Sequence, residues 1–109
     1  MTREEVAQAA REEIEALMKL VSWDPEVMLE DSFGRQGIIR QPGESLFDLA
    51  GRYFRMTGDD LRRIVAVFGT GLPPENLGRK PLDDSKLFDF YSVMWQLKIC
   101  LDRERGVVQ

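Results

Sequence analysis

The sequence contains no histidine and only one cysteine, Cys100. Histidine is the side chain most often used as a general base near neutral pH and as a transition-metal ligand. Its absence excludes serine–histidine and cysteine–histidine nucleophiles and histidine-containing zinc sites. A lone cysteine excludes an internal disulfide and an all-cysteine metal site within one chain, and we expect a buried structural thiol. We therefore expect a protein that is not an enzyme and has no cofactor or bound metal. The composition does not exclude a magnesium site formed by carboxylates.

Long apolar runs are also absent, since no stretch approaches the roughly 20 apolar residues that a membrane span needs. The first residues, MTREEVAQAAREE, are charged and lack the apolar core of a signal peptide. We therefore expect a cytoplasmic protein that does not contact a membrane. With 109 residues, of which 43% are hydrophobic and 31% charged, the chain has the size and composition of one globular domain spanning 1–109.

Charge is distributed unevenly along the chain. Residues 1–34 hold three basic and nine acidic side chains, a net charge of −6. Residues 35–63 hold six arginines and four acids, a net charge of +2, and residues 64–109 balance. An anionic ligand is therefore expected to bind the middle segment.

Helix signals recur along the whole sequence. Thr2 with Glu5 forms a capping box, Asp24 precedes a proline at the first helical position, and Ser45 and Thr57 are further cap residues. Gly34 and Gly106 suit the ends of helices. The apolar spacing predicts helices over 3–22, 25–34, 46–56, 58–68 and 84–105. The glycine- and proline-rich stretch 69–82 is expected to be irregular, with a single turn at 74–77.

The predicted fold is all-α: a single compact bundle of about five helices with a central long C-terminal helix. That helix is apolar around most of its circumference, which is typical of a central helix. We expect the helices over 3–22, 46–56 and 58–68 to face it. The stripe on the first helix comprises Val6, Ala10, Ile14, Leu17, Met18 and Val21, and the main face of the last helix comprises Leu87, Phe90, Tyr91, Met94, Leu97 and Leu101.

A second apolar stripe, formed by Phe88, Trp95 and Ile99, lies beside the main face of the last helix. Their spacing of seven and then four residues places them on one side of the helix. Aromatic side chains often carry much of the binding energy of a protein interface. We predict that these three residues bind a partner; the alternative is that the last helix is buried on every side.

Two predicted helices, 46–56 and 58–68, are separated by only a tight connection. Such a pair is typical of an ordinary antiparallel helix hairpin with solvated arginines, and a DNA-binding helix-turn-helix is the alternative. The stretch RYFRMTGDDL, residues 52–61, loosely resembles the DNA-binding domain of the bacterial replication initiator, which implies DNA binding. Asp59 and Asp60 stand at the leading end of the second helix, where they would repel phosphate. The side chains predicted to contact nucleic acid are Arg52, Arg55, Arg62 and Arg63.

Two pairs of acidic residues lie three or four residues apart: Glu12 with Glu15, and Glu26 with Glu30. Each pair shares one side of a helix, and two such helices facing each other would hold magnesium for pyrophosphate chemistry. The alternative is that both pairs belong to ordinary solvated helix faces.

A second resemblance concerns this chemistry. Gly37-Ile38 leads to Glu44, and Asp84-Ser85 leads to Asp89 on a long helix that bears a tyrosine. With these motifs, residues 37–101 resemble the all-α nucleoside triphosphate pyrophosphohydrolases of the MazG type and related phage nucleotide-modification domains. The resemblance implies a metal held by acidic residues with basic side chains nearby. Ser45 and Asp48 stand where basic residues are expected, which indicates a degenerate relative that has lost catalysis.

The hypothesis that the composition favours is a non-catalytic protein-interaction module: a small adaptor, an assembly subunit or an inhibitor of a larger complex. Its expected partner is another protein or a second copy of the chain, and its size would suit a phage or mobile-element protein. The alternatives are a helix-turn-helix nucleic-acid binder and a degenerate relative of the magnesium-dependent pyrophosphohydrolases.

Overall fold

The computed structural model describes residues 2–68 and 84–106. It confirms the predicted all-α bundle with a long C-terminal helix. The predicted irregular stretch 69–82, with its turn, lies outside the described residues. The helices are α1 (Arg3–Met18), α2 (Pro25–Arg35), α3 (Leu46–Phe54), α4 (Gly58–Ala66) and α5 (Asp84–Glu104).

The predicted helix starts are confirmed by their capping contacts. The Thr2 hydroxyl accepts the backbone N–H of Glu5 at 3.2 Å, and the Glu5 carboxylate accepts the backbone N–H of Thr2 at 3.3 Å. The side-chain oxygens of Asp24, Ser45 and Thr57 each accept a backbone N–H from the first turn of the helix that follows. These bonds satisfy N–H groups that have no partner within the helix, so short-range sequence determines where four helices begin.

Helix α2 ends one residue after the predicted stop at Gly34. The residue with the left-handed conformation is Gly37, with φ 84°. Its N–H bonds to the Gly34 carbonyl at 3.0 Å, and the N–H of Ile38 bonds to the Phe33 carbonyl at 3.0 Å. This pair of bonds is a Schellman motif, which requires glycine three residues beyond Gly34 and leaves Gly34 itself helical.

Helix α1 ends at Met18, four residues before the predicted boundary. The N–H of Leu20 bonds to the Leu17 carbonyl at 3.0 Å, a tighter i→i−3 turn after which the chain leaves the helix. The prediction that Val21 belongs to the buried stripe is therefore wrong, because its side chain is fully exposed. The helix ends early because the chain must cross from α1 to α2, which pack on different sides of α5.

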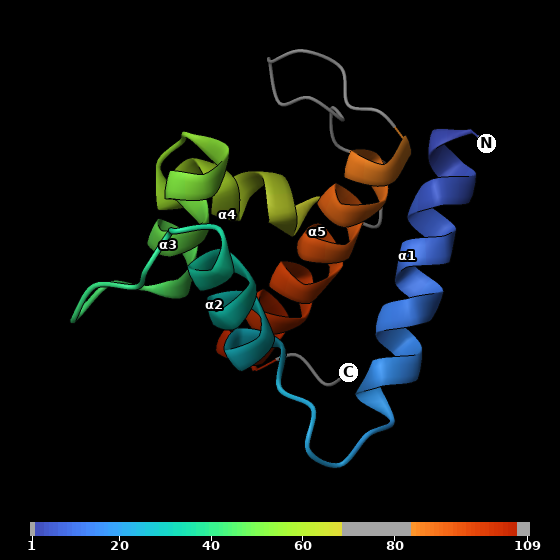
Figure 1. Cartoon of the computed structure of the whole chain (residues 1–109), viewed down its shortest axis with the longest axis horizontal. Coiled ribbons are helices and arrows are strands. Elements are labelled where there is room, and N and C mark those ends of the chain that lie inside the picture. Colours follow the sequence, from blue (N-terminus) through green and yellow to red (C-terminus); the bar gives the residue numbers. More distant parts are fainter. Residues whose placement is uncertain (1, 69–83, 107–109) are drawn as a thin grey trace.

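Helix α5 is central, with α1 on one side and α2 and α4 on the other (Figure 1). Helix α3 packs against α2 and α4 and reaches α5 through Phe54, whose ring centroid is 5.8 Å from that of Phe90. The sequence pattern predicted that α3, and not α2, faces the central helix. Helix α2 takes that place by burying Leu29 and Phe33 almost completely.

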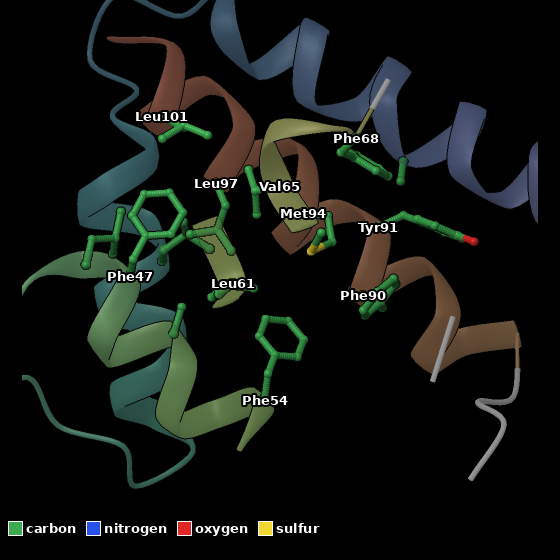
Figure 2. Packing of buried hydrophobic residues seen from close by; sticks show 14 of the residues in the cluster. Phe47, Phe54, Leu61, Val65, Phe68, Phe90, Tyr91, Met94, Leu97 and Leu101 are labelled. Carbon is green, nitrogen blue, oxygen red and sulfur yellow. The ribbon is translucent and has the colours of Figure 1, made fainter. Parts of the chain in front are cut away.

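The core is one continuous cluster built around the main face of α5 (Figure 2). All six residues predicted for that face are buried, and Tyr91, Met94 and Leu97 have no exposed surface. Among the described residues, no polar or charged residue is fully buried. In the same part of the chain, no helix has both the length and the apolar content needed to cross a bilayer.

Candidate interaction surface

The apolar stripe beside the main face of α5 packs against its own chain. Ile99 is 6% exposed, and Phe88 and Trp95 are half-buried against the core. The indole N–H of Trp95 donates to the Ala7 carbonyl of α1 at 3.2 Å. Most of the apolar surface expected to be left over on α5 is therefore covered within the chain. That a partner binds these three residues stays a prediction, and only the partly exposed surfaces of Phe88 and Trp95 are accessible to it.

Arg52, the first of the four arginines predicted to contact nucleic acid, binds the connection between α2 and α3. Its guanidinium donates to both carboxylate oxygens of Glu44, at 2.9 and 2.8 Å, and to the Ile39 carbonyl at 2.6 Å. The backbone N–H of Gln41 also donates to Glu44, at 3.0 Å. A two-pronged arginine–carboxylate contact is among the stronger hydrogen-bonded pairs, so Arg52 and Glu44 fix the shape of residues 36–45.

Replacing Glu44 by glutamine is expected to lower the melting temperature near neutral pH and to weaken its dependence on pH. Hydrogen bonds from Arg52 and from the backbone of Gln41 hold the pKa of Glu44 below its ordinary value of 4.5. A depressed pKa stabilises the folded state above the unfolded-state pKa, and this contribution is lost as the pH falls through the folded-state value. Thermal melts followed by circular dichroism at about pH 7 and about pH 3 measure the effect.

Glu13→Gln is the matched control for this variant. Glu13 is exposed and has no hydrogen bond or ion pair within the described residues. The Glu13→Gln variant should have the melting temperature of the unmodified protein at both pH values. An unchanged pH dependence in Glu44→Gln would contradict the role given to Glu44.

Two of the other three arginines are also paired within the chain. Arg62 of α4 bonds to Glu104 of α5 and lies over the Phe47 ring, 4.4 Å from its centroid. Arg63 pairs with Asp60 at 3.1 Å. Arg55 has no ion pair among the described residues. Three of the four arginines already have partners within the chain, and nucleic-acid binding stays a prediction.

The two acidic pairs that could form a magnesium site instead contact basic or polar side chains. Glu26 and Glu30 do converge, but on the guanidinium of Arg40, at 3.0 and 3.1 Å. Glu15 pairs with Arg11, and Glu12 accepts a hydrogen bond from Gln8. Among residues 2–68 and 84–106, no three histidine, cysteine, aspartate or glutamate side chains lie close enough to hold a metal ion. The Asp84 side chain of the pyrophosphohydrolase resemblance lies outside the described side chains.

A cleft of about 430 Å³ lies where the N-termini of α2 and α3 meet the C-terminal part of α5. Its lining includes three arginines and three acidic residues, so its positive and negative charges balance. Cys100 also lines it, and burial together with nearby carboxylates raises the pKa of its thiol to about 12. The thiol is therefore protonated at neutral pH and lacks the thiolate that nucleophilic chemistry requires.

The exposed apolar side chains gather at the start of α2 and in the connection before it. Leu20 is 57% exposed, Val21 106%, Val27 61% and Met28 42%. We call these four residues the 20–28 surface. The two remaining large apolar side chains that are exposed in the described chain, Ile39 and Val67, lie elsewhere. In Figure 1 the connection from α1 to α2 projects beyond the ends of both helices, at the lower edge of the view.

The indole N–H of Trp23, in the same connection, is buried and has no hydrogen-bond partner among the described residues. An unsatisfied buried donor is uncommon in a folded protein. The local packing of this connection therefore leaves both apolar surface and one polar group without a partner.

The 20–28 surface was not predicted from the sequence, because the spacing of Val21 places it in a helical stripe. One signal was available, since Val27, Met28 and Leu29 are three consecutive apolar residues at a helix start. A helix on the surface of a bundle can direct only part of such a run toward the core. Leu29 takes the core position, so its two neighbours face outward.

Comparison with known proteins adds no relative. No protein-family model, no curated protein and no solved structure matches this chain.

Proposed function

We propose that the protein is a non-catalytic interaction module that binds a protein partner through the 20–28 surface. The observation that carries this proposal is the concentration of exposed apolar side chains. Four of the six large ones in the described chain fall within nine residues, and Val21 has no cover at all. Exposed apolar side chains concentrated in one segment are typical of a binding site.

The apolar side chains of this surface would contribute part of the free energy of binding. Fully burying one valine or leucine side chain contributes roughly 1.5–3 kcal/mol. Each such contribution changes a dissociation constant by about tenfold or more. Burying Leu20, Val21 and Val27 together would therefore supply most of the apolar component of a transient complex, before the cost of association is subtracted.

Site-specific photo-crosslinking tests the proposal. The photoreactive amino acid benzoylphenylalanine is placed at Val21 or Val27 of the full chain, and extract of the source cells is irradiated with it. We expect a single discrete product from each position. The same probe at Ile39 is the control, because Ile39 is 65% exposed but lies outside the surface.

The proposal also predicts the effect of Val21→Ser. The variant should lose about tenfold or more in affinity for the crosslinked partner, because a buried valine is replaced by a polar side chain. Its melting temperature should not change, because Val21 makes no core contact. Equal crosslinking from Val21 and Ile39, or none from Val21 and Val27, would count against the proposal.

A further inference from the structure

The 20–28 surface lies in the most acidic part of the chain. Glu30 and Asp31 are three and four residues after Val27 in α2, and Asp24 is the cap residue that precedes the helix. On a helix, residues three or four apart are surface neighbours, so Glu30 and Asp31 border Val27 directly.

Acidic side chains outnumber basic ones around this surface by one: residues 19–40 hold four carboxylates and three cations, Lys19, Arg35 and Arg40. Glu26 and Glu30 share a single guanidinium, that of Arg40. Asp31 has only an exposed contact with Arg35, at 3.4 Å. Such surface pairs contribute little. Asp24 has no ion pair within the described chain, but its carboxylate accepts the N–H of Glu26 and lines the cleft that also holds three arginines. The net charge of residues 1–34 is −6, whereas the remaining residues add +2.

From this charge pattern we infer that the partner presents a lysine- or arginine-rich segment with apolar residues interleaved, such as a basic amphipathic helix. The inference rests on the proposed function and specifies the partner's chemistry. A second copy of the chain would bring a like-charged acidic border against the first, and nucleic acids would be repelled in the same way. A basic segment would instead be attracted, and its apolar residues would cover the exposed side chains.

Fluorescence anisotropy with two designed peptides tests the inference. The probe is a fluorescein-labelled amphipathic helix of about 14 residues made of leucine and lysine, and its counterpart has glutamate in place of lysine. The unmodified full chain should bind the lysine peptide about tenfold or more tightly than the glutamate peptide. Raising the salt concentration about fivefold should weaken this binding several-fold, because exposed charges are screened.

Variants locate the binding to the surface. The double variant with Val21→Ser and Val27→Ser should bind the lysine peptide about tenfold or more weakly. Glu30→Gln with Asp31→Asn should weaken it several-fold and reduce its dependence on salt. Ile39→Ser is the control and should stay within about twofold of the unmodified chain. Circular dichroism melts check that each variant is folded.

Several outcomes would overturn the inference. They are equal binding of the two peptides, binding of neither peptide, and an equal loss of affinity for the lysine peptide in Ile39→Ser and in the variant with both valines replaced. Dimerisation of the chain that Val21→Ser abolishes would replace the basic partner with a second copy. If Val21 crosslinks a partner but the chain binds the two peptides equally, the proposed surface stands and only the basic partner is refuted. If there is neither crosslinking nor a preference for the lysine peptide, the proposed function itself is refuted.

Discussion

Replacing Gly51 by alanine is expected to lower the free energy of unfolding by about 3 kcal/mol, because the new Cβ would clash with the backbone of the α3–α4 corner. The N–H of Met56 bonds to the Gly51 carbonyl at 2.9 Å, so the chain turns back directly over this residue. A Cβ at Gly51 would lie 2.5 Å from the Met56 carbonyl oxygen and 3.3 Å from the Gly58 nitrogen. No flexible side chain can move aside, so the two helices must separate. Helix α4 would then lose the fit of Leu61 and Val65, which are fully buried.

Gly34→Ala is the control for this prediction. A Cβ at Gly34, in α2, would meet no atom within 4 Å, and the residue has ordinary helical conformation. Alanine favours the helix over glycine, so this variant should be neutral or more stable by up to about 1 kcal/mol. Urea denaturation followed by far-ultraviolet circular dichroism compares the two. If Gly51→Ala falls within about 0.5 kcal/mol of the unmodified chain, the corner is not closely packed.

The parts of the fold that the sequence predicts are those determined by contacts between near neighbours. Thr2, Asp24, Ser45 and Thr57 cap helices as expected because each needs only a backbone N–H two or three residues ahead. The helix ends are less predictable. Val21 continues the helical spacing of α1, yet the chain leaves the helix before reaching it, because the position of α2 on the other side of α5 requires a crossing.

The candidate site was harder to predict because its determinants are far apart in sequence. Arg62 appears free in the sequence, but its partner Glu104 is 42 residues away. Arg52 and Glu44 are eight residues apart and come together only because residues 36–45 fold back along α3. Periodicity likewise shows that a helix face is apolar without showing which neighbour covers it. For that reason the stripe at Trp95 was predicted to bind a partner, and the exposed residues of the 20–28 surface were not identified.

Trp95→Ala is expected to lower the free energy of unfolding by about 3 kcal/mol, because the indole joins α1 to α5. Its ring centroid lies 4.1 Å from that of Phe68, and the Arg11 guanidinium stacks over it at 4.9 Å. Its N–H donates to the Ala7 carbonyl of α1. Alanine would remove all three contacts and leave a cavity between the helices. Because the indole is only partly buried, the loss should fall toward the lower end of the range for tryptophan in a core.

Trp95→Phe separates the hydrogen bond from the ring contacts. Phenylalanine keeps most of the aromatic packing but has no N–H, so the expected loss is about 1 kcal/mol. Val21→Ala is the external control and should leave stability unchanged, since Val21 is fully exposed. Denaturant titration gives all three values. If Trp95→Ala were as stable as Val21→Ala, the indole would not join α1 to α5 and a docking role for α5 would regain support; a large loss would mean that the indole stabilises the bundle itself.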